Sequence, residues 1–85
     1  MTPFVVDWTD DALDMLADIW TQAANRPAVN AASNQIDRLL ARDPLGHGQP
    51  AHEGLYKLSV PPLTAYYSID QAHNTVEVSA VRYTP

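Results

Sequence analysis

The stretch from Gly54 to Asp70 constrains the fold most, because two runs of alternating side chains flank a pair of prolines. In the first run, Tyr56, Leu58 and Val60 alternate with Leu55, Lys57 and Ser59. The second run would place Leu63, Ala65, Tyr67 and Ile69 on one side and Thr64, Tyr66, Ser68 and Asp70 on the other. A period of two is typical of strands, and proline cannot donate to a strand ladder. We therefore predict a β-hairpin that turns at Pro61 and Pro62 and lies at the centre of a small sheet.

Further elements are predicted on both sides of this hairpin. Thr9 is a suitable N-cap, and apolar residues at helical spacing follow it. The residue before a proline avoids the helical region, so Asp43 should end a second helix. The predicted elements are a strand over 4–8, helices over 10–25 and 27–43, a glycine- and proline-containing loop over 45–53, the hairpin, a turn over 71–74, and a strand over 75–83.

These elements predict an α+β fold of two layers, in the order βααβββ, within a single domain covering residues 1–85. A short connection between the helices predicts a helical hairpin packed on an antiparallel four-stranded sheet with spatial order 1-4-3-2. Trp20 shares an apolar stripe with Leu13 and Leu16, so we expect it to be buried between helices and sheet. Trp20→Ala should then cost about 3–5 kcal/mol.

The charge balance argues against a nucleic-acid-binding protein. Five Lys and Arg residues oppose ten Asp and Glu residues, a net charge of −5. Binding to phosphates depends on cations, so we expect no tight direct binding of nucleic acid. The chain has no cysteine, and it lacks a signal-peptide pattern and any apolar run long enough for a membrane span. These features predict a cytoplasmic protein that is not bound to a membrane.

Other chemistry-bearing residues are given structural interpretations. His47, His52 and Glu53 lie in the predicted loop without a recognised metal-ligand spacing, so we predict no metal and no cofactor. The tyrosines are expected to pack under the helices or a partner. Asp10, Asp14 and Asp18 line one face of the first predicted helix, and we interpret them as a solvated face, with a docking face for a basic partner as the alternative. Together with Asp7 and Asp11 they could suggest a hard-metal site, but helical spacing spreads most of them along a face, so solvation is again the interpretation.

An ordered set of segments along the whole chain resembles one known family. The set comprises Ala12-Leu13, Leu16 and Ile19-Trp20, then Ile36-Asp37, Asp43-Pro44 and Gly46, then Leu55 to Asp70, then Val76 to Arg82. In this order they resemble the RelE/ParE family of toxins from bacterial type II toxin–antitoxin systems. The Ile19-Trp20 pair and the proline-ended hairpin resemble ParE-like members more than RelE-like ones.

The resemblance implies a toxin of the plasmid-stabilisation type that a cognate antitoxin neutralises. ParE-like toxins poison DNA gyrase, whereas RelE-like toxins cut mRNA on the ribosome with sheet arginines and lysines. Three positions where the family has cations carry Tyr56, Thr64 and Ser68 here. The resemblance therefore favours a protein target such as gyrase over an enzyme. The alternatives are a ribosome-dependent mRNA endoribonuclease, with Lys57, Arg82 and Tyr83 as candidate catalytic residues, and an inactive toxin-fold binding module or dimer.

A partner surface is predicted on the sheet face opposite the helices. That face should carry Tyr66 and Ser68 from one strand and Glu77 and Ser79 from the next. Aromatic anchors within a polar surface are typical of protein interfaces. We expect the antitoxin, or a second copy of the chain, to dock along this face and the adjacent edge strand.

Overall fold

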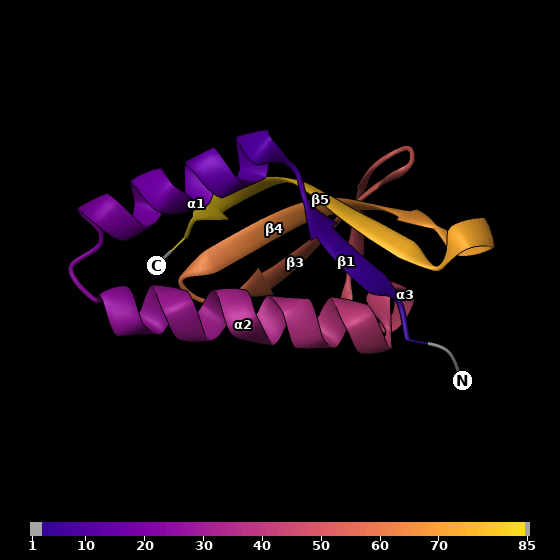
Figure 1. Ribbon diagram of the computed structural model, residues 1–85, viewed down its shortest axis with the longest axis horizontal. Helices are drawn as coiled ribbons and strands as arrows, with labels where there is room; N and C mark the ends of the chain where they lie inside the picture. The colour runs from indigo at the N-terminus through magenta and orange to yellow at the C-terminus, as the bar shows by residue number, and fades with distance from the viewer. Residues whose placement is uncertain (1–2, 85) are drawn as a thin grey trace.

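The protein consists of a five-stranded sheet and two long helices (Figure 1). The computed structural model describes residues 3–84. The strands lie in the order β1-β5-β4-β3-β2. Figure 1 shows α1 and α2 running in opposite directions, as predicted for a helical hairpin. The elements are β1 (Val5–Trp8), α1 (Asp10–Gln22), α2 (Arg26–Arg42), α3 (Pro44–His47), β2 (Gln49–His52), β3 (Leu55–Val60), β4 (Leu63–Asp70), the 3-10 turn η1 (Gln71–His73) and β5 (Thr75–Tyr83).

The predicted α+β class is confirmed, and two details of the sheet differ from the prediction. The four predicted strands are neighbours in the predicted order, but β1 pairs with β5 in parallel. The segment predicted as a loop over 45–53 contributes a fifth strand, β2, which pairs antiparallel with β3. Pro50 and a register shift before His52 interrupt this pairing, and both are tolerated at a sheet edge.

The connection between the two long helices is longer than predicted, because α1 ends at Gln22 and α2 begins at Arg26. Helix α1 begins after Thr9, whose hydroxyl accepts a hydrogen bond from the Ala12 N–H at 3.1 Å. It ends at Gln22 rather than near residue 25. Asn25 caps α2 instead, by accepting from the Ala28 N–H at 3.1 Å. Asp43 ends α2 and caps the short helix α3 through the Gly46 N–H at 3.0 Å.

The expectation that Trp20 is buried is wrong. The side chains of Trp20 and Leu13 are 41% and 48% exposed. The face of α1 that packs on the sheet is rotated away from Leu13 and Trp20. On that face Ala12 is fully buried, and Leu16, Ile19 and Ala23 pack against the core. Since Trp20 does not fill a closed core site, the cost of 3–5 kcal/mol expected for Trp20→Ala does not apply to it.

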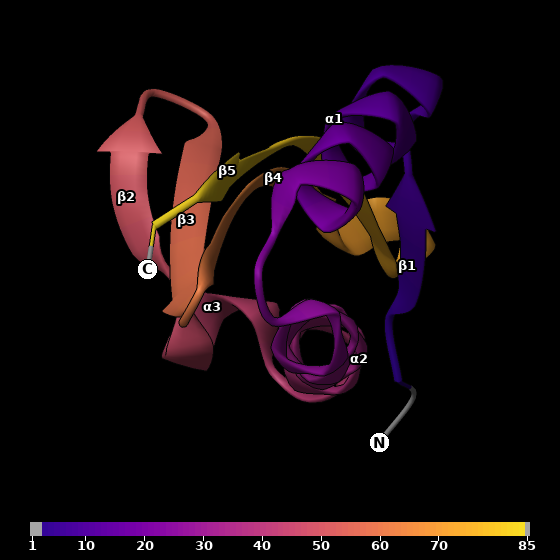
Figure 2. The same ribbon diagram turned by 90° about the vertical axis from the view of Figure 1, so that its left-hand side faces the viewer.

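The core lies between the helices and the sheet, with α2 seen end-on below the curved sheet in Figure 2. Tyr67 on β4 has no exposed surface, and its hydroxyl donates to the Pro44 carbonyl at 2.6 Å. Its ring stacks on that of Tyr56 with centroids 5.8 Å apart. The other buried hydrophobic residues are Ala12, Val29, Ala32, Ile36, Leu40, Leu58, Leu63, Ala65, Val76, Val78 and Val81.

The buried Tyr67 hydroxyl makes stability sensitive to alkaline pH. Burial, together with Tyr56 and Asp43, raises the pKa of Tyr67 from its ordinary value of 10.0 to about 12. Because the folded-state pKa lies above the unfolded one, the contribution of this phenol to stability is complete below pH 10 and is lost as the pH rises toward 12. Urea midpoints measured across this range should fall. Tyr67→Phe should flatten the decline, whereas Tyr83→Phe, at an exposed position, should leave it unchanged.

Candidate partner-binding face

The sheet face opposite the helices is centred on Tyr66. In the register of the sheet, Tyr66 lies beside Lys57 of β3 and Ala80 of β5. The Arg82 guanidinium carbon lies 5.9 Å from the centroid of the Tyr66 ring, within the range of a cation–π contact. Lys57 and Arg82 therefore flank one aromatic ring on one face, which is hereafter called the far face.

The third candidate catalytic residue does not join them. Tyr83 is paired with Leu63, and Leu63 is in the core beneath the helices. Adjacent residues of a strand point to opposite faces, so Tyr83 lies on the face opposite Arg82. The structure brings Lys57 and Arg82 together around Tyr66 and leaves Tyr83 out of the cluster.

A chain of hydroxyl groups lies next to this cluster. Thr64 is buried, and its Oγ1 is 3.0 Å from the Ser59 Oγ and 2.8 Å from the Thr84 Oγ1. Thr64 pairs with Arg82 across the β4–β5 ladder. By the family resemblance, Thr64 occupies a position that usually carries a cation, and the sequence alone indicates no role for Ser59 or Thr84. The alternation of side chains in the hairpin is the sequence feature that could have indicated this contact, because it places Ser59 and Thr64 on the same face of the sheet.

The other predicted partner residues lie farther along the far face. Ser68 pairs with Glu77, and with Ile69, Asp70 and Thr75 they line a hollow of about 260 Å³. The His73 imidazole lies 2.8 Å from the Asp70 carboxylate and holds the pKa of Asp70 below its ordinary value. The far face is therefore basic around Tyr66 and acidic around Glu77.

Ser79 lies where the ladder between β4 and β5 is irregular. Tyr66 pairs with Ala80 while Tyr67 pairs with Val78, so Ser79 is left without a direct partner. Its hydroxyl donates to the Tyr66 carbonyl at 3.5 Å. Such a bulge bends a strand and increases its twist. The hydrogen bond places Ser79 beside Tyr66, in the predicted partner face.

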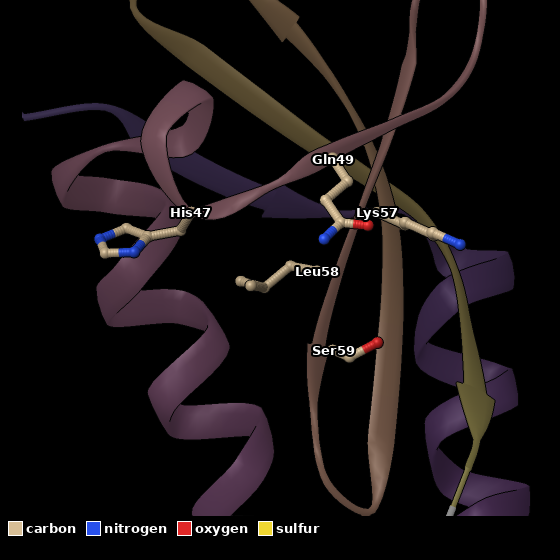
Figure 3. Close-up of a pocket in the computed structure, with 5 residues that line it drawn as sticks. All are labelled: His47, Gln49, Lys57, Leu58 and Ser59. Atoms are coloured by element: carbon tan, nitrogen blue, oxygen red, sulfur yellow. The ribbon is translucent and has the colours of Figure 1, made fainter.

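A hollow of about 150 Å³ lies at the β2 edge of the sheet (Figure 3). Gln49 at the start of β2 pairs with Lys57, and β2 has no partner for Leu58 to Val60 on this side. Figure 3 shows His47 and Leu58 on one side of the strand and the tips of Lys57 and Ser59 on the other. The imidazole is therefore not directed at the lysine. An unpaired stretch of β3 is left at the edge, as strand addition requires.

The residues considered as metal ligands are not assembled into a site. In residues 3–84, no three or more His, Cys, Asp or Glu side chains are grouped so that they could hold a metal ion. His47, His52 and Glu53 are exposed in or after separate short elements. No helix in the described part of the chain is long and apolar enough to cross a membrane.

Comparison with solved structures shows the same fold in toxin–antitoxin proteins. A chain of the RelBE2 toxin–antitoxin complex from Mycobacterium tuberculosis superposes with a TM-score of 0.82 at 24% identity, covering 98% of this chain and 93% of that one. A chain of the chromosomal ParDE system from P. aeruginosa has a TM-score of 0.73 at 16% identity, with 96% and 97% covered. A free mutant of the E. coli toxin RelE has a TM-score of 0.67 at 15% identity, with 98% and 84% covered.

Sequence comparison identifies the family. No curated protein matches the sequence. The model of the ParE toxin of the type II toxin–antitoxin system, parDE, matches residues 6–84. This range includes both long helices and every strand except the first residue of β1. The chain therefore belongs to the ParE toxin family of type II toxin–antitoxin systems.

Proposed function

We propose that this ParE-family toxin acts on a protein target, DNA gyrase, and that its antitoxin neutralises it by covering the far face and the open edge of β3. The observation that supports this most is the composition of the far face. Tyr66 lies between Lys57 and Arg82, in a surface that is otherwise mostly neutral or acidic. An aromatic residue flanked by long cationic side chains is typical of a protein interface anchor.

The same cluster is poorly equipped for RNA cleavage. Cleavage needs a general acid and base within hydrogen-bonding reach of the reacting groups. The far face offers the hydroxyls of Ser59, Thr64 and Thr84 beside Arg82, and these hydroxyls are engaged with one another. Tyr83, the remaining candidate, lies on the opposite face of β5. These positions favour binding over catalysis.

Expression in a bacterial host tests the function directly. Induction should arrest growth, and co-expression of the neighbouring antitoxin gene should relieve the arrest. The purified toxin should inhibit supercoiling by purified gyrase, and purified antitoxin should relieve this inhibition. We place this activity in the cytoplasm, where gyrase acts, and a plasmid-loss assay tests for plasmid stabilisation. A folded protein that does not affect growth would instead support the inactive binding module or dimer, which sizing by light scattering would distinguish.

A ribosome-dependent endoribonuclease is the second candidate, because Lys57 and Arg82 lie on the same face. Primer extension on cellular mRNA after induction should show new cleavage sites if it is correct. The purified protein, with its net charge of −5, should bind RNA weakly at physiological salt. Submicromolar affinity with a steep dependence on salt would favour this candidate over gyrase inhibition.

Tyr66→Asp should weaken the antitoxin complex at least tenfold without unfolding the toxin. The ring lies on the far face and is only partly buried, and the new carboxylate would neutralise the cations on either side of it. Calorimetry with the purified antitoxin would measure affinity, and circular dichroism would check folding. Tyr83→Asp is a matched control, because it makes the same change at an exposed position on the opposite face of β5. Equal affinity of a folded Tyr66→Asp variant and the wild type would remove Tyr66 from the interface.

A further inference from the structure

The far face carries a cation and an anion at equal distances from Tyr66. Arg82 pairs with Thr64, which lies two residues before Tyr66 on β4. Glu77 pairs with Ser68, which lies two residues after Tyr66. A strand rises about 3.3 Å per residue, so the two opposite charges lie about 7 Å to either side of Tyr66 along the strand direction. The far face therefore has a positive half and a negative half, with Tyr66 between them.

Neither charge is neutralised within the described part of the chain. Arg82 and Glu77 are both exposed, and the ion pair found among the described residues is that of His73 with Asp70. Asp7 lies directly opposite Glu77 in the β1–β5 ladder, and like charges opposite one another destabilise a sheet. A cation placed over Glu77 would relieve this repulsion.

Arg82 is oriented for contact with a partner. Its guanidinium carbon lies 5.9 Å from the centroid of the Tyr66 ring, and a side chain fixed before binding loses less entropy on association. Next to it, the Thr64 hydroxyl is within hydrogen-bonding distance of the hydroxyls of Ser59 and Thr84. Because these hydroxyls satisfy one another, a partner can cover them without leaving a buried polar group unpaired.

The equal spacing makes the far face complementary to itself. Two copies that meet face to face are related by a two-fold axis lying in the interface. When this axis crosses the strands at Tyr66, Arg82 of each copy lies over Glu77 of the other. An axis along the strands would instead place like charges over one another, which is unfavourable. The charges therefore select one orientation of the two copies.

We propose that the free toxin forms a homodimer through the far face, in which the two Tyr66 rings meet on the two-fold axis and Arg82 of each copy pairs with Glu77 of the other. Strands about 4.8 Å apart that rise about 3.3 Å per residue give this face roughly 500 Å² per copy. Specific interfaces usually bury about 800 Å² per partner, and the net charge of −5 on each copy opposes association. The dimer is therefore weak, so the antitoxin can compete for the same face. This inference goes beyond the proposed function, because it concerns the toxin without its antitoxin.

Lys57 distinguishes this dimer from the antitoxin complex. It pairs with Tyr66 on the neighbouring strand, so the axis brings it near the same residue of the second copy. Lys57 lines the hollow at the β2 edge (Figure 3), and a long lysine side chain can keep its charge in solvent. Lys57→Ala should therefore leave the dimer at least as strong, whereas it should weaken an antitoxin complex in which Lys57 flanks the anchor. Loss of the dimer in this variant would contradict the position of the axis.

Sedimentation velocity of the full-length toxin over a range of concentrations tests the inference. The wild type should shift from monomer to dimer as the concentration rises. Arg82→Glu and Glu77→Arg should each weaken the dimer at least about tenfold, because each places like charges together. An equal mixture of the two variants, and the double variant carrying both changes, should dimerise like the wild type, because each restores opposite charges. Arg38→Glu is the matched control, since it makes the same reversal at an exposed position on α2.

The outcomes separate this inference from the proposed function. A wild type that stays monomeric at every concentration would overturn the dimer and leave the antitoxin interface as proposed. A dimer that persists in both single variants, or that the mixture and the double variant do not restore, would place the contact on another face and overturn the inference. Failure of the antitoxin to bind the toxin would overturn the proposed function alone. Circular dichroism would confirm that each variant is folded.

Discussion

Tyr67→Ala is expected to remove a large share of the free energy of unfolding. Tyr67 is the largest of the fully buried side chains, and it contacts both the β3 strand and the start of α3. Truncation of a buried aromatic residue costs about 3–5 kcal/mol, against a total stability of roughly 5–15 kcal/mol for a typical domain. The Pro44 carbonyl would also lose its hydrogen-bond donor, which adds to the cost.

Urea denaturation followed by circular dichroism would measure this loss. Tyr66→Ala is the matched control, because it removes the same ring type from the next residue on the opposite face of β4. We expect Tyr66→Ala to lower the midpoint much less than Tyr67→Ala. Equal midpoints for the two variants would contradict the assignment of the faces of β4.

Gly48→Ala is expected to be the other severe substitution. A Cβ atom at Gly48 would overlap the Tyr67 hydroxyl oxygen and lie 2.8 Å from Tyr67 Cζ and 3.2 Å from the Pro44 carbonyl oxygen. Because the Tyr67 ring is fixed in the core, the clash must displace the ring or the connection between α3 and β2. Overpacking of this kind costs about 1–3 kcal/mol or more, and it would also break the Tyr67–Pro44 hydrogen bond.

A double variant can attribute the cost to this contact. Adding Tyr67→Phe removes the overlapping oxygen, so Gly48→Ala should cost less in that background than in the wild type. Gly54→Ala is a useful comparison, since Gly54 has a φ of +75° but no atom within 4 Å of its Cβ position. It should cost about 1 kcal/mol through backbone strain alone. A Gly48→Ala variant no less stable than Gly54→Ala would disprove the close approach.

The hairpin was predictable because its pattern is local. Alternation and two prolines place Tyr66 and Tyr67 on opposite faces, and the structure confirms that Tyr67 is in the core. Alternation also applies to β5, where Arg82 and Tyr83 are adjacent and therefore point to opposite faces. They could not both belong to one candidate site on a single face. The bulge at Ser79 has no such local signal, because it depends on how β5 pairs with β4.

The errors in α1 and at the sheet edges arise from tertiary packing. Apolar residues occupy more of the surface of α1 than the sheet can cover. From the sequence, the large side chain of Trp20 is a better candidate for the core than the small side chain of Ala12. The structure instead buries Ala12, whose small side chain allows close packing. The pairing of β1 with β5 joins segments about 70 residues apart in the chain, so its parallel direction could not be read from either segment.

The position of β5 in the sheet has a consequence for folding during synthesis. Of the described strands, β5 is the last in the chain, yet it lies between β1 and β4. In the described sheet, β1 has no partner besides β5, so β1 cannot pair until β5 has been made. Such long-range pairing slows folding. A nascent chain on the ribosome therefore cannot complete this sheet, or present the toxin fold, until residues 75–83 have emerged.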